Sequence, residues 1–423
     1  MCKKSQYRLN VPGVQLVFCT GNRGSDVMDA FRSVFRRVFV PFLVLLLVGC
    51  GGRERTEVFP GAWESVRAVV DHSRQPLSAP WNCSVTLEIG EASGADEYIL
   101  RSPFALTVLP GGLIVIEDDR PLQLRVYDSR GGHVSSFGQP GGGPGDLTPG
   151  RFRWVMRPLD ERTFQLWSGW PPRVQEWTVD GELLGVQSLR ADHPMVLGTA
   201  PLTIGFIDDE LYWVARSHRL DHEGRSIGTS HILVGDIQGT AADTLTSIRH
   251  EPMPTEYQLA LQFGLDYAYL LDDHILVTRD RKCYLTSWLE DWVTEVDLQR
   301  GVPVLRFRWE HEPDAIPVAV SERMDRQLDA ASRDMLVEGL TWLQERVSLL
   351  GLAEGPEGRI LVQRTGEPVD ENWPTDVFGP DGRYLDRVLL PVEPRTAVLS
   401  GRDLIGLGIR QGVPVIRVVR LGR

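Results

Sequence analysis

Short runs in which apolar and polar residues alternate fill most of the chain, and one of these runs recurs. Each copy follows a glycine or an acidic turn, and its alternation is typical of a β-strand. The copies are GGLIVIED (111–118), ERTFQLWS (161–168), DDELYWVA (208–215), DDHILVTR (272–279), EGRILVQR (357–364) and GRDLIGLG (401–408). A strand that returns six times indicates a repeat architecture.

The residues around each copy predict a four-stranded antiparallel unit. A shorter strand precedes the copy, and a second strand, a tight turn and another strand follow it. The turns SRGG, VDGE, QRGV and PDGR place glycine where a tight hairpin needs a positive φ. Six such units predict an all-β fold, a six-bladed β-propeller of four-stranded antiparallel blades. A β-sandwich is the alternative, but it does not repeat one four-strand unit six times.

The last unit is one strand short. Residues 396–423 hold three strands of the pattern and then the chain stops. The stretch WNCSVTLEIG at 81–90 has no place in the other units, and its Val85, Leu87 and Ile89 alternate as in a strand. We therefore expect this N-terminal strand to be the outer strand of blade six and to close the ring, which leaves no orphan blade edge.

A helical insertion is predicted before blade five, at about 317–350. Ser321 can cap a helix, and apolar residues then recur near a period of 3.6: Met324, Leu328, Met335, Leu340, Leu343 and Val347. Such a helix would cover apolar surface of the propeller, or it would bind a partner.

The N-terminal region has the pattern of a targeting segment. Arg36 and Arg37 precede the apolar run 38–48, which is too short for a membrane-spanning helix and suits a signal peptide. The run ends in Leu-Val-Gly-Cys, which resembles the lipobox of bacterial lipoproteins, with lipid attachment at Cys50. A plain signal peptide or an apolar anchor with an incidental cysteine is the alternative.

These features divide the chain into three parts. Residues 1–49 are the predicted signal peptide, of which 1–27 are interpreted as an upstream extension because Met28 gives a signal of ordinary length. Residues 50–80 are the lipidated N-terminus and a tether, and residues 81–423 are the propeller. Gly51 stands where an aspartate commonly retains such proteins at the inner membrane, so we expect a lipid-anchored envelope protein at the outer membrane, facing the periplasm.

At this point the sequence resembles the bacterial six-bladed β-propeller lipoproteins that are related to NHL-repeat propellers. The run 111–147 carries the resemblance together with Cys50, above all Arg125-Val126-Tyr127-Asp128 and the stretch FGQPGGGPGDL at 137–147. The resemblance implies the fold and an envelope location, and it implies little chemistry.

Several motifs that carry chemistry elsewhere are interpreted here as architecture. FGQPGGGPGDL lacks the lysine of a phosphate-binding loop and no helix follows it, so we interpret it as the crossover from blade one to blade two. The acidic pairs Asp118-Asp119, Asp208-Asp209 and Asp272-Asp273 lie at strand ends or turns, where Asp turns the backbone. We predict no catalytic, cofactor-binding or metal-binding residues and no cofactor.

One stretch is a candidate recognition surface. WSGWPPRVQEW at 167–177 combines Trp167, Trp170, Arg173 and Trp177, and exposed aromatics with arginine are typical of binding surfaces. Buried, the same residues would be blade packing. Two cysteines, Cys83 and Cys283, lie outside the signal peptide and the lipid site. They form either a disulfide or two separate thiols.

The charge balance narrows the range of partners. The chain carries 57 acidic and 45 basic residues, a formal net charge of −12, which argues against a nucleic-acid-binding face. The expected function is a lipid-anchored binding or scaffold module for a protein, peptide or glycan ligand. The alternative is a calcium-dependent propeller hydrolase or lyase of the lactonase type.

Overall fold

The computed structural model divides the chain into two units, Met1–Arg55 and Thr56–Arg423. It describes residues 6–11, 14–19, 57–58, 66–71, 81–147, 155–169, 172–188, 204–220, 226–236, 242–253, 274–278, 280–286, 292–309, 349–364 and 368–422. The described part of the first unit is a hairpin of β1 (Gln6–Val11) and β2 (Val14–Cys19). The second unit holds six sheets.

Each of these sheets contains an antiparallel meander of consecutive strands, and we number the blades in chain order. Blade one contains β6 (Pro103–Val108), β7 (Ile114–Asp119), β8 (Leu122–Tyr127) and β9 (His133–Phe137). Blade two contains β10 (Val155–Pro158), β11 (Thr163–Gly169), β12 (Pro172–Thr178) and β13 (Leu183–Ser188). Blade three contains β14 (Ile204–Ile207), β15 (Glu210–Leu220), β16 (Ser226–Asp236) and β17 (Ala242–Met253).

The remaining blades follow the same order. Blade four contains β18 (His274–Val277), β19 (Lys282–Thr286), β20 (Val293–Asp297) and β21 (Val302–Trp309). Blade five contains β22 (Leu349–Gly355), β23 (Arg359–Arg364), β24 (Trp373–Phe378) and β25 (Tyr384–Leu390). Blade six contains β26 (Val398–Ser400), β27 (Asp403–Arg410) and β28 (Val413–Gly422), with β5 (Asn82–Ile89) beside β28. Among the described residues, three 3₁₀ turns lie between strands, at Asp96–Tyr98 (η3), Pro356–Gly358 (η4) and Pro394–Thr396 (η5).

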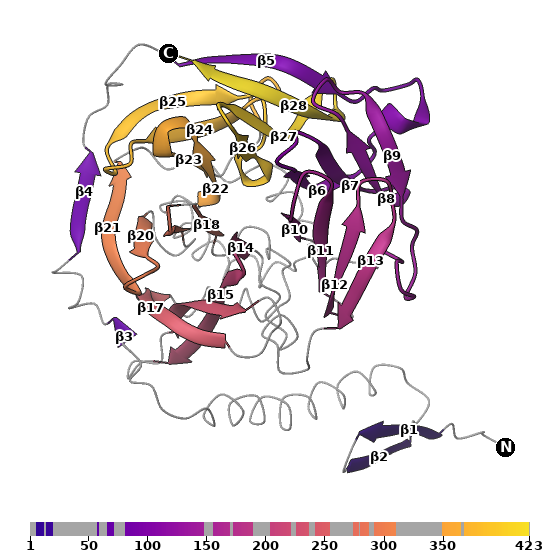
Figure 1. Ribbon diagram of the computed structural model, residues 1–423. Helices are drawn as coiled ribbons and strands as arrows, with labels where there is room; N and C mark the ends of the chain where they lie inside the picture. The colour runs from indigo at the N-terminus through magenta and orange to yellow at the C-terminus, as the bar shows by residue number, and fades with distance from the viewer. Residues whose placement is uncertain are drawn as a thin grey trace, which may run out of the picture. The chain divides into compact units, whose positions relative to one another are not determined.

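The blades stand in a ring with the first strand of each blade innermost, as Figure 1 shows. The predicted all-β fold of six four-stranded antiparallel blades is confirmed. One repeat copy was placed wrongly: residues 272–279 hold β18, the innermost strand of blade four, whereas the other five copies hold the second strand of their blade. The second strand of blade four is β19. An apolar run such as HILV fits either position, and alternation alone cannot separate them.

Apolar clusters fill the interfaces between neighbouring blades. Val115 and Trp177 belong to the cluster between blades one and two, and Phe307 and Phe378 to the cluster between blades four and five. Further clusters lie between blades two and three, three and four, and five and six. A sixth cluster joins blade six to blade one and includes Ile416 and Ile116. Burial between sheet faces is therefore what holds the blades to one another.

The hairpin glycines explain how consecutive blades approach so closely. Gly131, Gly181, Gly301 and Gly382 lie between the third and fourth strands of blades one, two, four and five, with φ of 85°, 88°, 63° and 80°. A Cβ on Gly181 would come within 2.8 Å of Phe137, and one on Gly382 within 2.9 Å of Phe307. Phe137 and Phe307 lie on the outer strand of the preceding blade. These positions therefore need glycine for both their backbone conformation and the contact.

β5 comes from the stretch predicted as an N-terminal strand at 81–90. It pairs antiparallel with β28, from Asn82 opposite Gly422 to Ile89 opposite Ile416, with one register shift. A Cβ on Gly131 of blade one would lie 3.2 Å from both Leu87 and Ile89 of β5. β5 thus meets the hairpin glycine of blade one as β9 meets that of blade two.

Two further strands come from the segment that the sequence assigns to a tether. β3 (Glu57–Val58) pairs in parallel with β17, the outer strand of blade three. β4 (Arg67–Asp71) pairs in parallel with β21, the outer strand of blade four, over five residues. Figure 1 shows β4 alongside β21 at the rim of the ring.

Some predicted features lie outside the described residues. These include Cys50, the lipobox and all but the last two residues of the predicted insertion at 317–350, where Leu349 and Leu350 begin β22. In the part of the chain that is described, no helix is long and apolar enough to cross a membrane.

Candidate functional site

The antiparallel order of the blades gives the ring two different faces. The connections between consecutive blades and the loops between second and third strands lie at one end of the blades, which we call the crossover face. The turns between first and second strands and the hairpins between third and fourth strands lie at the other end, the hairpin face. The strand bounds leave six long stretches of sequence between strand ends at the crossover face, at residues 90–102, 138–154, 189–203, 254–273, 310–348 and 391–397. The hairpin face is built from short turns such as 109–113, 179–182 and 401–402.

The glycine-rich loop 138–147 is the crossover from blade one towards blade two, as the sequence predicts. Its backbone N–H groups are used inside the loop: that of Gly141 bonds the Leu147 carbonyl at 3.0 Å, and that of Gly143 bonds the Asp146 carboxylate at 2.7 Å. Arg173 donates to the Gly143 carbonyl at 3.0 Å and Gln175 to the Asp146 carbonyl at 3.1 Å. Blade two therefore holds the loop by its carbonyls, and the loop does not offer a ring of N–H groups to a phosphate.

Three of the four residues of the predicted recognition surface are buried. Trp167 is 0% exposed and packs between blades two and three, whereas Trp177 is 4% exposed and packs between blades one and two. Arg173 is 6% exposed beneath the glycine-rich loop. Trp170 lies outside the described residues. Trp167, Arg173 and Trp177 thus serve blade packing and do not form one exposed patch, because blade two packs against blade one on one side and blade three on the other.

An exposed aromatic residue lies elsewhere on the crossover face. Phe104 is 42% exposed and stands at the crossover end of β6, the innermost strand of blade one. The register between β6 and β7 shifts between Pro103 and Leu106, so Phe104 leaves the regular alternation. The sequence FALTV reads as an ordinary buried strand, and only the preceding proline marks the irregularity. Phe104 is therefore a candidate contact residue that sequence reasoning missed.

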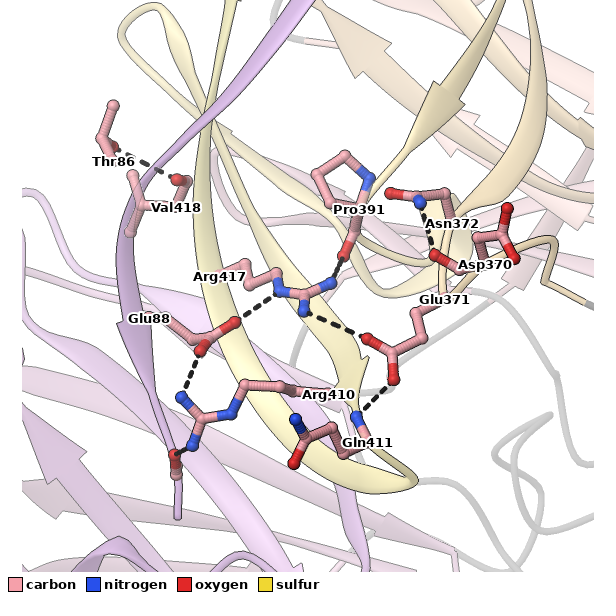
Figure 2. Close-up of polar contacts among 11 residues, drawn as sticks. Thr86, Glu88, Asp370, Glu371, Asn372, Pro391, Arg410, Gln411, Arg417 and Val418 are labelled. Carbon is pink, nitrogen blue, oxygen red and sulfur yellow. Dashed lines mark hydrogen bonds and ion pairs between the residues drawn. The ribbon is translucent and has the colours of Figure 1, made fainter. Parts of the chain in front are cut away.

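A polar cluster joins blades five and six to β5, as Figure 2 shows. The Glu88 carboxylate of β5 accepts from Arg417 Nε at 2.8 Å and from Arg410 Nη1 at 2.6 Å. Arg417 is 8% exposed and also donates to the Pro391 carbonyl at 2.9 Å. Its second terminal nitrogen lies 3.9 Å from the Glu371 carboxylate. A buried guanidinium with these partners fixes three chain segments relative to one another.

The same cluster includes two tight turns that place residues other than glycine in the left-handed region. Asp370 and Glu371 have φ of 47° and 65°, and Gln411 has φ of 51°. Val369 and Asn372 exchange backbone hydrogen bonds of 2.7 and 2.9 Å across the first turn, and the Glu371 carboxylate accepts from the Gln411 N–H. Val369 is 50% exposed, and Asp370 and Gln411 are exposed as well. Left-handed residues outside glycine are costly and persist where the surrounding contacts hold the backbone, so the hydrogen bonds across and between these turns hold their backbone on the crossover face.

Blade one carries an acidic run with two different environments. Asp118 is fully buried, pairs with Arg125 at 3.0 Å and accepts from the Ser102 N–H at 2.8 Å. Glu117 is 2% exposed, and its Oε2 has no hydrogen-bond partner among the described residues. Burial, reinforced by the charges of Asp119 and Asp118, raises the pKa of Glu117 to about 8. Glu117 is therefore held as a neutral acid at pH 7.

The acidic pair Asp208-Asp209 forms ion pairs with arginines. Asp208 pairs with Arg281 at 2.9 Å and Asp209 with Arg157 at 3.1 Å, while Asp272 and Asp273 lie outside the described residues. Within the described ranges, His, Cys, Asp and Glu do not gather in any group of three or more that could hold a metal ion.

The two cysteines of the propeller are free thiols in different blades. Cys83 lies on β5 and Cys283 on β19. Burial raises the pKa of Cys83 to about 11 and that of Cys283 to about 12. Both thiols are thus protonated at neutral pH and are poor nucleophiles.

Comparison with known proteins supports the fold. No family model matches the sequence, and no curated protein matches it either. A DUF4221 family member from Bacteroides vulgatus is similar in structure at 7% identity, with a TM-score of 0.51, over 81% of this chain and 99% of that chain. A Bacteroides fragilis protein described as exported matches at 11% identity and a TM-score of 0.49, over 85% of this chain and 100% of that chain. Virginiamycin B lyase from Staphylococcus aureus matches at 8% identity and a TM-score of 0.42, over 80% of this chain and 99% of that chain. Identities this low show the fold alone.

Proposed function

We propose that this protein is a lipid-anchored envelope β-propeller that binds a protein, peptide or glycan ligand on its crossover face. The observation that carries the proposal is the asymmetry of the two faces: long stretches of sequence join strand ends at the crossover face, and short stretches join those at the hairpin face. Loops carried on a rigid scaffold are where binding residues concentrate. The fold by itself supplies no chemistry, so the proposal rests on this face.

Two kinds of exposed residue favour the crossover face as a binding surface. Phe104 on the innermost strand of blade one and Val369 on the turn between β23 and β24 of blade five are 42% and 50% exposed. Asp370 and Gln411 place polar groups on the two turns beside the Glu88–Arg417 cluster. The crossover face thus offers a partner exposed apolar residues on two blades and polar groups beside Val369, and recognition sites combine both kinds of residue.

Substitutions on the two faces test this proposal in a pull-down. Immobilised protein without the signal segment is incubated with detergent-solubilised envelope, and retained proteins and glycans are quantified by mass spectrometry. Phe104→Ala and Asp370→Lys should lose a component that wild-type protein retains. Asp180→Lys, an exposed substitution in a hairpin of blade two, should keep it. If Asp180→Lys loses the component and the crossover-face variants keep it, the assignment of the face is wrong.

We also propose that β5 closes the ring as the outer strand of blade six. Its antiparallel pairing with β28 and its contact with Gly131 of blade one support this role. The cluster that includes Ile89, Ile416 and Ile116 further supports a packed junction between blades six and one. Closure of this kind leaves β28 without a free edge.

The anchoring part of the proposal rests on the lipobox that ends in Cys50. A diacylated cysteine would hold the protein at the membrane without spanning it. The Cys50→Ala protein should therefore appear in the soluble fraction after cell lysis. Recovery of Cys50→Ala protein with the membranes would contradict lipid attachment at this residue.

A further inference from the structure

The three strands within residues 57–89, a stretch that we call the rim segment, pair with the outer strands of blades three, four and six. β3 pairs with blade three, β4 with blade four and β5 with blade six. Between β4 and β5, Trp81 lies over the guanidinium of Arg359 in blade five, with 4.4 Å between the arginine carbon and the ring centroid. The chain therefore travels around the rim in the order three, four, five, six before it enters blade one.

Side-chain packing also holds this segment to the blades. Val69 of β4 packs against the apolar cluster between blades four and five, and Trp81 packs against the cluster between blades five and six. The five register pairs of β4 give a continuous parallel ladder with β21. Backbone pairing and apolar burial together make the rim segment part of the propeller unit, which begins at Thr56.

This arrangement leaves a short linker to the lipidated residue. Cys50 precedes Thr56 by six positions, and an extended chain spans at most about 3.6 Å per residue, so the linker reaches roughly 20 Å. A tether that was free as far as residue 80 would reach several times further. The anchored end enters the propeller at β3, on the outer edge of blade three.

We infer that the rim segment orients the propeller at the membrane, with the rim of blade three against the lipid surface. This inference rests on the proposed lipid attachment at Cys50. In a ring of six, blade six lies opposite blade three, so the edge formed by β5 points away from the lipid. Both faces then stand at an angle to the membrane, and the crossover face stays open to a ligand in the surrounding space.

Fluorescence quenching from the lipid surface tests the orientation. The full-length lipidated protein is reconstituted in vesicles of phosphatidylethanolamine and phosphatidylglycerol that carry a headgroup quencher. A genetically encoded fluorescent residue replaces Thr244 on β17 or Thr86 on β5, two exposed threonines on opposite blades. We expect loss of fluorescence at position 244 and none at position 86. Equal loss at both positions, or greater loss at 86, would overturn the orientation.

Variants of the rim segment separate its role from that of the anchor. The double substitution Val58→Pro and Val69→Pro removes the pairing of β3 with β17 and of β4 with β21. The lipid anchor is then connected to the propeller through β5, and the difference in fluorescence loss between positions 244 and 86 should disappear. The double substitution Val58→Ile and Val69→Ile is the matched control and should retain the difference in fluorescence loss. A difference that survives the proline substitutions would overturn the role of the rim segment. Cys50→Ala protein that still floats with the vesicles would overturn the anchor, and the orientation with it.

Discussion

Among single residues, Glu117 should have the clearest effect on how stability depends on pH. Its pKa rises from 4.5 to about 8 because it is buried on the second strand of blade one beside two other carboxylates. The folded protein thus binds this proton more tightly than the unfolded chain. Its contribution is fully present below about pH 4.5 and is lost as the pH rises through 8.

Glu117→Gln should therefore remove part of the pH dependence of stability. In wild type, the free energy of unfolding should fall by up to about 1.4 kcal/mol for each pH unit between 5 and 8 because of this group. The amide does not titrate, so the variant should lose that slope. Urea denaturation at several pH values measures it, and equal slopes in both proteins would contradict the account.

The hairpin glycines are single residues that determine how closely neighbouring blades pack. Gly181→Ala places a Cβ 2.8 Å from Phe137 at a φ of 88°, so both overpacking and backbone strain oppose the substitution. We expect a loss of roughly 2–4 kcal/mol in the free energy of unfolding. Gly401→Ala is the matched control, since its φ is 64° but no atom lies within 4 Å of the added Cβ. It should cost only about 1 kcal/mol, and an equal cost in both variants would contradict the packing argument.

At the scale of elements, the Glu88 cluster determines how firmly β5 is held. Glu88→Ala would remove the carboxylate that lies 2.8 Å from the guanidinium of Arg417, which is 8% exposed, and would leave only the Glu371 carboxylate at 3.9 Å. Breaking a buried pair from one side costs about 3–5 kcal/mol. Arg410→Ala removes only the more exposed arginine and should cost about 1 kcal/mol or less. Hydrogen exchange along β5 should accelerate in Glu88→Ala alone, and unchanged exchange there would contradict the role of the cluster.

Sequence patterns predicted the strands that pair with their neighbours in the sequence. The turn glycines and the alternating runs placed five of the six recurring strands at the second position of their blade, and only residues 272–279 were placed wrongly. β3 and β4 could not be predicted in this way, because their partners lie far along the chain and their own residues show little alternation. The burial of Trp167 and Trp177 also depends on which neighbouring blade each side chain faces, and local sequence does not contain that information.

At the scale of the whole molecule, the ring concentrates its variable parts on one face. The innermost strands and the apolar clusters between blades form a rigid frame, and the crossover connections vary in length around it. The rim segment adds a second constraint, because it holds the N-terminal end of the unit at blade three. We therefore expect ligand contacts to occur on the crossover face.

Site-specific photo-crosslinking in intact cells measures that claim most directly. A photoreactive residue replaces Phe104 or Asp370 on the crossover face, or Asp160 or Asp180 on the hairpin face, and all four positions are exposed. The account predicts crosslinked adducts from positions 104 and 370, and background levels from positions 160 and 180. Adducts that form mainly from positions 160 and 180 would contradict it.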